Sequence, residues 1–117
     1  RNGRPSFFQI TNACCELIER IQARRPETPI VLCKVGPVAG RYAFLSDLIR
    51  DYNQSIEKIA DYYGLALVDA YTPFVNEEGL LSDQYTRDGL HLNDEGYQIW
   101  ADRLSEKYEE VLAAELN

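Results

Sequence analysis

Histidine is nearly absent from this sequence, and methionine is missing altogether. The 117 residues contain one histidine, three cysteines and one tryptophan. A lone histidine, with cysteines only at positions 14, 15 and 33, matches no spacing of zinc ligands. We therefore expect no metal site and no cofactor. The odd number of cysteines also argues against a framework of disulfide bonds.

Positive charge and long apolar runs are scarce as well. Lys and Arg number 12 against 19 Asp and Glu, which gives a formal net charge of -7. Nucleic acid is excluded as a partner because phosphate binding requires clustered Lys and Arg. We expect no membrane span, since no apolar run approaches the roughly 20 residues that a spanning helix needs. The remaining composition is typical of one globular domain and leaves the cellular compartment open.

Three stretches have the apolar spacing of amphipathic helices. The first helix is predicted to begin near residue 10 and to stop before Pro26. The second is predicted over residues 45–63, with Gly64 as its C-cap, and the third begins at Asp94 as its N-cap. The apolar positions are Ile10, Ala13, Cys14, Leu17, Ile18 and Ile21 in the first helix; Leu45, Leu48, Ile49, Tyr52, Ile56, Ile59, Ala60 and Tyr63 in the second; and Tyr97, Trp100, Ala101, Leu104, Tyr108, Val111 and Leu112 in the third.

Two short apolar runs, residues 30–35 and 65–68, separate these helices. Nearly continuous apolar runs are typical of strands buried on both faces of a parallel sheet. Cys33, and Cys14 on the first helix, are accordingly predicted to be small buried hydrophobes. The alternating order predicts an open α/β fold with a parallel sheet. Two strands would leave edges and apolar faces uncovered. We therefore expect further strands N-terminal to Arg1, on the same polypeptide, on a second chain or on a swapped copy.

The single histidine lies in a long loop, residues 70–93, within the stretch Asp88-Gly89-Leu90-His91. Sites in open α/β sheets gather beyond the carboxyl ends of the strands, where an imidazole can act as a general base. An aspartate three residues earlier can reach one ring nitrogen, fix the tautomer and stabilise the imidazolium. Asp-Gly is also a common turn dipeptide. Spacing alone therefore leaves open that Asp88 only caps backbone N–H groups and that His91 packs or lies in solvent.

The wider stretch YTRDGLHLNDEGYQIWA resembles the last conserved block of the SGNH hydrolases, also called GDSL-type esterases and lipases. The upstream segments RRPETPIVL, DYNQSIEKIADYYGLALVD and EEGLLSDQYTRDGLHL are similar too, so the resemblance runs from about residue 8 to about residue 104. It implies a flavodoxin-like α/β/α sandwich, of which residues 1–117 supply the last two strands and three helices. It also implies hydrolysis of an acyl ester by a serine nucleophile. In this comparison His91 matches the general base and Asp88 the residue that orients it.

The other motifs of that family are missing. There is no Gly-Asp-Ser, and none of the five serines follows a predicted strand; they are Ser6, Ser46, Ser55, Ser82 and Ser105. The nearest match to the family's oxyanion-hole block, Gly-x-Asn-Asp, is Ile10-Thr11-Asn12-Ala13, which lacks both the Gly and the Asp, and Asn53 is expected to be structural. Without an activated serine no acyl-enzyme forms, and loss of one oxyanion donor costs about a hundredfold to a thousandfold in rate. We expect the chain alone to be inactive or nearly so.

The parent protein is expected to be an esterase for a short acyl ester, with an acetyl group on a sugar as one candidate. An acyltransferase with the same residues and a non-catalytic module that has lost the nucleophile remain alternatives. A flavodoxin-like binding domain is disfavoured because Pro37 offers no N–H to a phosphate.

Two residues near the strand ends, and the aromatic residues of the helices, have weaker cases. Asp69 is expected to cap the following turn rather than line the site. Arg41, in a loop with Gly36 and Tyr42, could contact an anionic or sugar group, although a solvated surface position is equally compatible with the sequence. The aromatic residues of the helices are expected to form core or interface; they are Tyr52, Tyr62, Tyr63, Tyr97, Trp100 and Tyr108.

Overall fold

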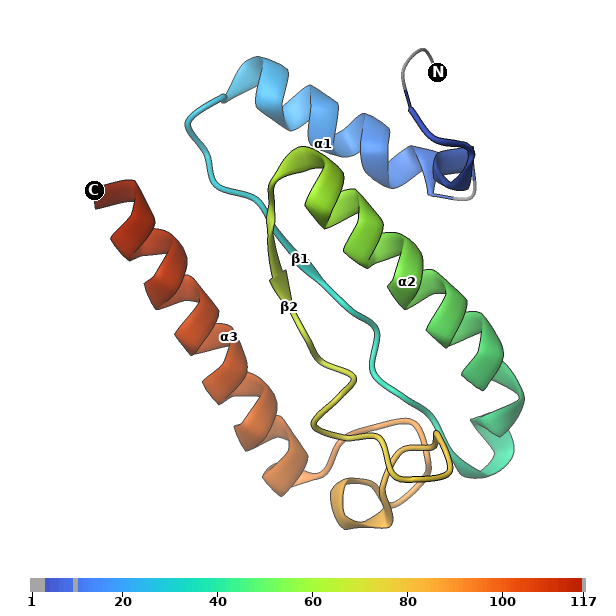
Figure 1. Cartoon of the computed structure of the whole chain (residues 1–117). Coiled ribbons are helices and arrows are strands. Elements are labelled where there is room, and N and C mark those ends of the chain that lie inside the picture. The colour runs from blue at the N-terminus through green and yellow to red at the C-terminus, as the bar shows by residue number, and fades with distance from the viewer. Residues whose placement is uncertain (1–3, 10, 117) are drawn as a thin grey trace.

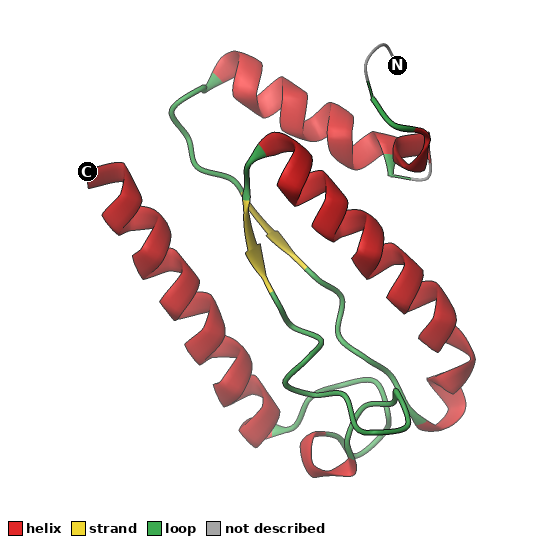
Figure 2. Ribbon diagram, in the orientation of Figure 1, coloured by secondary structure: helices red, strands yellow, loops and turns green. Residues whose placement is uncertain are grey.

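A computed structural model describes residues 4–9 and 11–116 of the chain. The elements are η1 (Ser6–Gln9), α1 (Asn12–Arg24), β1 (Val31–Cys33), η2 (Gly40–Leu45), α2 (Ser46–Tyr63), β2 (Ala66–Val68), η3 (Asp83–Tyr85) and α3 (Asp94–Leu116). The predicted α/β order is confirmed, with three helices and a sheet of two strands (Figures 1 and 2). β1 and β2 pair in parallel, with Val31 opposite Ala66 and Cys33 opposite Val68. The predicted start of the first helix at Ile10 lies outside the described residues.

Helices α1 and α2 cover one face of the strands, and α3 runs along the other side (Figure 1). The main core lies under α1 and α2, where Cys15 and Ile59 are fully buried. Cys15, rather than Cys14, is therefore the buried cysteine of α1, and Cys14 is only half-buried. A second core cluster around Phe74 and Leu81 lies beneath the loops at the other end of the strands.

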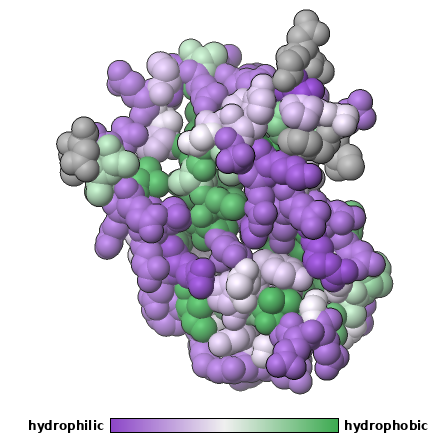
Figure 3. Space-filling view, in the orientation of Figure 1, coloured by the Kyte–Doolittle hydropathy of each residue, from purple (hydrophilic) through white to green (hydrophobic). Residues whose placement is uncertain are grey.

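The expectation that β1 is buried on both faces is wrong for the described chain. Cys33 is exposed, and Val31 and Val35 expose 37% and 43% of their surface. The physical reason is that α3 packs against β2 and leaves the neighbouring face of β1 uncovered. Figure 3 shows hydrophobic surface gathered between α3 and the other helices. The apolar stripe of α3 is exposed along a hollow in this surface, at Leu104, Tyr108 and Leu112.

We call this hollow the apolar groove. It has a volume of about 910 Å³, and its apolar lining consists of Pro29, Val31, Leu104, Tyr108, Val111 and Leu112. Among the described residues, no helix has both the length and the apolar character needed to cross a membrane.

The helix ends follow the sequence closely, with one shift. Gly64 is the C-cap of α2, as predicted, with φ at 66° and its N–H bonded to the carbonyls of the last turn. The predicted N-cap of α3 is wrong by one residue. Asn93 performs this role by accepting the N–H of Gly96 at 3.0 Å, and Asp94 is the first helical residue. Asn and Asp are nearly equal as caps, so composition could not separate these two neighbours.

Candidate active site

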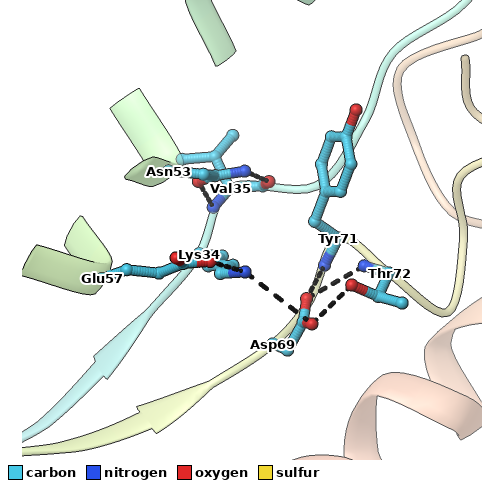
Figure 4. A network of polar contacts seen from close by, with 7 residues as sticks. All are labelled: Lys34, Val35, Asn53, Glu57, Asp69, Tyr71 and Thr72. Atoms are coloured by element: carbon cyan, nitrogen blue, oxygen red, sulfur yellow. Dashed lines mark hydrogen bonds and ion pairs between the residues drawn. The ribbon is translucent and has the colours of Figure 1, made fainter. Parts of the chain in front are cut away.

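The carboxyl ends of both strands are fixed by a polar network (Figure 4). The buried amide of Asn53 accepts the N–H of Val35 and donates to its carbonyl, each at 2.7 Å. These two hydrogen bonds to the backbone confirm Asn53 as structural, because they anchor α2 to the chain just after β1. Lys34, on the same strand end, pairs with Glu57 of α2 and lies 3.9 Å from Asp69.

Asp69 caps the turn that follows β2. Its Oδ1 accepts the N–H groups of Tyr71 and Thr72, both at 2.9 Å, and its Oδ2 accepts the Thr72 hydroxyl at 2.6 Å (Figure 4). Partial burial raises the pKa of Asp69, but the hydrogen bonds from Thr72 and Tyr71 outweigh it, and the pKa lies below its usual value. The expected capping role is confirmed.

The loop that carries Asp88 and His91 packs against the loop that follows β1. Gly89 is the point of contact: its carbonyl accepts the Ala39 N–H at 2.8 Å. Its φ is 84°, and a Cβ added here would lie 2.3 Å from the Ala39 carbonyl oxygen. Only glycine adopts this conformation without strain and permits so close an approach. The Asp-Gly dipeptide therefore forms the turn and also makes the contact with the loop that follows β1.

The Asp88 carboxylate bonds both to the backbone and to the imidazole. Its Oδ1 accepts the N–H groups of Leu90 at 2.9 Å and His91 at 2.8 Å, and its Oδ2 lies 2.7 Å from Nδ1 of the His91 ring. The hydrogen bond with the ring, together with those from the two backbone N–H groups, lowers the pKa of Asp88 well below its usual range. An ionised Asp88 accepts a hydrogen bond from Nδ1–H, so the neutral ring keeps its proton on Nδ1 and presents an unprotonated Nε2.

The ring of His91 is open to solvent, with 70% of its side chain exposed. It borders two hollows. The polar hollow, of about 610 Å³, is lined by Arg87, Asp88, Asn93, Asp94 and Glu95 among others. The apolar hollow, of about 320 Å³, contains Val35, Gly36, Pro37, Leu90, Tyr97 and Trp100 in its lining. Of the five serines, all within the described part of the chain, none lines either hollow.

The other residues considered from sequence lie differently. Gly36 lines the apolar hollow, whereas the Arg41 guanidinium lies 5.3 Å from the centre of the Tyr42 ring and borders neither hollow. Sequence reasoning missed Thr86, which is buried beneath the turn, although threonine hydroxyls commonly bond to nearby backbone groups in turns. In the described ranges, no group of three or more His, Cys, Asp or Glu side chains could hold a metal ion.

A parallel α/β sheet with an aspartate–histidine pair at its carboxyl edge is an architecture found among hydrolytic enzymes. The chain belongs to the GDSL-like lipase/acylhydrolase family, whose model matches residues 3–99. The resemblance stated from the sequence is thereby confirmed. No curated protein matches the chain significantly.

Solved structures share the fold. A protein of Streptococcus pneumonia described as a platelet activating factor is 26% identical, with a TM-score of 0.73; the match covers 86% of this chain and 51% of that one. A GDSL-like lipase of Bacteroides thetaiotaomicron is 24% identical, with a TM-score of 0.78, and the match covers 94% of this chain and 56% of the lipase. A Bacteroides fragilis protein assigned as an acylhydrolase gives 21% identity and a TM-score of 0.67, over 95% and 55% of the two chains. The chain thus spans about half the length of the solved structures it matches.

Proposed function

We propose that the protein carrying these residues hydrolyses a carboxylic ester, with His91 as the general base and Asp88 as the group that orients it. The observation that carries the proposal is the 2.7 Å contact between Asp88 Oδ2 and His91 Nδ1, beside an exposed ring. Membership of the GDSL-like lipase/acylhydrolase family supports the same reaction.

In this mechanism, the hydroxyl oxygen of a serine attacks the carbonyl carbon of the ester, and Nε2 of His91 takes the proton of that hydroxyl. The imidazolium, stabilised by Asp88, then returns the proton to the leaving alcohol, and water releases the acyl group by the same route. Because no described serine borders His91, the nucleophile and the oxyanion donors are proposed to come from another segment. Acyl transfer would differ only in the final acceptor, an alcohol in place of water.

That segment is proposed to complete the domain, of which residues 1–117 form the C-terminal portion. The uncovered face of β1 and the apolar groove beside α3 supply surface for it. An exposed apolar patch of this kind is typical of an interface. The matches cover only 51% and 56% of two of the solved structures, so the rest of those chains has the length for such a segment. The segment could stand on the same polypeptide or on a second chain.

The proposed substrate is a short acyl ester. The apolar hollow beside His91, about 320 Å³, lies at the small end of the range of about 300–1,000 Å³ for ligand pockets. The polar hollow, which His91 also borders, could receive a hydroxyl-rich alcohol through Arg87, Asp94 and Glu95. An acetylated sugar would fit this division into an apolar and a polar side.

A second candidate is a non-catalytic module that keeps the fold. One observation favours it: His91 faces solvent, and no described serine borders either of its hollows. This candidate and the esterase predict opposite results for a reagent that reacts only with an activated serine.

The test is labelling with a fluorophosphonate, followed by intact mass, together with hydrolysis of p-nitrophenyl acetate. It is run on the protein isolated from its natural source and on the 117-residue chain produced alone, of 13.4 kDa. We expect an adduct on the serine-bearing polypeptide and none on the isolated chain. His91→Ala should lower kcat/KM by about 10²–10⁴, the usual contribution of a general base. The matched control is Gln54→Ala, an exposed position on α2.

Two results would contradict the esterase. The first is the absence of an adduct on the natural protein, which favours the non-catalytic module. The second is an adduct, or hydrolysis, that survives His91→Ala unchanged, because the serine would then be activated by another base.

A further inference from the structure

Thr86 is a buried threonine directly beneath the turn that presents Asp88 and His91. The residue is only 9% exposed, and three polar atoms of the turn surround its hydroxyl. Oγ1 lies 2.7 Å from the carbonyl oxygen of His91, 3.0 Å from the N–H of Gly89 and 3.4 Å from Oδ1 of Asp88. A hydroxyl has one proton. It therefore donates to the nearer His91 carbonyl and accepts the N–H of Gly89.

The peptide groups on both sides of His91 are consequently fixed by side chains. The Thr86 hydroxyl holds the carbonyl of His91, and the Asp88 carboxylate holds its N–H at 2.8 Å. A β-bridge between Thr86 and Leu92 closes the same segment. With the backbone of His91 held at both ends, only the side-chain torsions remain to bring Nδ1 to Oδ2 of Asp88.

We propose that Thr86 is a positioning residue for the Asp88–His91 pair. Its hydroxyl keeps the turn in the conformation in which Oδ2 meets Nδ1, and so keeps the neutral imidazole protonated on Nδ1 with Nε2 unprotonated. The catalytic consequence rests on the proposed function, whereas the consequence for the tautomer does not, because the hydrogen bond made by one ring nitrogen sets the state of the other.

The turn has enough other supports to stay folded without this hydroxyl. Gly89 remains bonded to Ala39, and the N–H of Asn93 bonds to the carbonyl of Tyr85 at 2.8 Å. Thr86→Val replaces the hydroxyl by a methyl group of similar size, and Thr86→Ser restores the hydroxyl. Thr86→Ala also removes the hydroxyl, but without placing a methyl group against the buried N–H of Gly89.

The first measurement is the tautomer of His91, read from long-range proton–nitrogen NMR spectra at a pH where the ring is neutral. The signals are assigned by their loss in His91→Gln. We expect Nδ1 to carry the proton in the wild type and in Thr86→Ser, and mixed tautomers in Thr86→Val and Thr86→Ala. Thr72→Val is the matched control, because it removes a threonine hydroxyl that bonds to Asp69 at the same sheet edge. It should leave the tautomer unchanged.

The second measurement is ester hydrolysis by the natural protein. Misplacement of a catalytic group by about 1 Å can cost on the order of a hundredfold in rate. We expect Thr86→Val to lower kcat by about tenfold to a hundredfold with little change in KM, and Thr86→Ser to stay within about threefold of the wild type.

A wild-type tautomer in both Thr86→Val and Thr86→Ala would overturn the proposal, as would mixed tautomers in Thr86→Ser. Should Thr86→Val fail to fold, as judged by circular dichroism, Thr86→Ala alone decides. Failure of the proposed function gives a different pattern: hydrolysis is unaffected by His91→Gln, while the tautomer still depends on the Thr86 hydroxyl.

Discussion

Replacing Gly89 by alanine tests whether the turn lies against the loop after β1. The left-handed φ of 84° costs a residue with a Cβ roughly 1–2 kcal/mol. The new Cβ would also lie 2.3 Å from the oxygen and 2.7 Å from the carbon of the Ala39 carbonyl. These are backbone atoms, so no side chain can rotate away. The turn must shift and weaken the bond from Ala39 to Gly89, worth about 1 kcal/mol.

Together with about 1–3 kcal/mol for overpacking, the expected loss is roughly 3–6 kcal/mol. Gly64→Ala is the matched control, because Gly64 has a similar φ of 66° but no atom within 4 Å of its added Cβ. It should cost only the torsional contribution of roughly 1–2 kcal/mol.

The assay is urea unfolding followed by circular dichroism for the wild type and both variants. We expect the free energy of unfolding of Gly89→Ala to lie at least about 2 kcal/mol below that of Gly64→Ala, which is the difference left when the shared torsional cost cancels. Since the whole stability of a domain is about 5–15 kcal/mol, such a loss is readily measured. Equal free energies for the two variants would refute the reasoning, because the turn could not then be packed against Ala39.

Three further predictions follow from the same contacts. Asn53→Ala leaves both polar groups of Val35 unpaired and should cost about 2–4 kcal/mol in urea unfolding, whereas the exposed Gln54→Ala stays within about 0.5 kcal/mol; equal losses would contradict this. A thiol reagent should modify Cys33 in the native protein and Cys15 only after unfolding, as mapped by peptide mass; native labelling of Cys15 would contradict its burial. Because the pKa of Asp88 is lowered in the folded state, its ionised form stabilises the fold above the ordinary carboxyl pKa of roughly 3.9. The difference in unfolding free energy between the wild type and Asp88→Asn should therefore shrink as pH falls below about 4, in unfolding measured from pH 7 to 3. An increase in this difference at acidic pH would contradict the lowered pKa.

The helices and strands were predictable where their signals are local. The helical spacing located α2, and the glycine after Tyr63 located its end, because a left-handed C-cap strongly favours glycine. The exposure of Cys33 and Val35 was not predictable in the same way. An apolar run shows that a strand prefers burial, but the covering partner lies far away in the chain or outside it. The sequence therefore predicted that β1 is buried on both faces, whereas the described chain covers only one of its faces.

The candidate site divides along the same line. Asp88 and His91 are three residues apart, so the turn alone determines whether the carboxylate reaches the ring. Sequence reasoning could name the contact but treated capping and orientation as alternatives. The structure shows that they are compatible, because a carboxylate has two oxygens: Oδ1 takes the backbone N–H groups and Oδ2 lies against Nδ1.

The hydrogen bonds from the backbone to Oδ1 fix the carboxyl group of Asp88, and this leaves Oδ2 in place to orient the His91 ring. A further support comes from Ala39, some fifty positions earlier in the sequence, and no local pattern predicts that contact. A search for such pairs in other sequences should therefore look for a turn that can hold the carboxylate, and not for the Asp-x-x-His spacing alone.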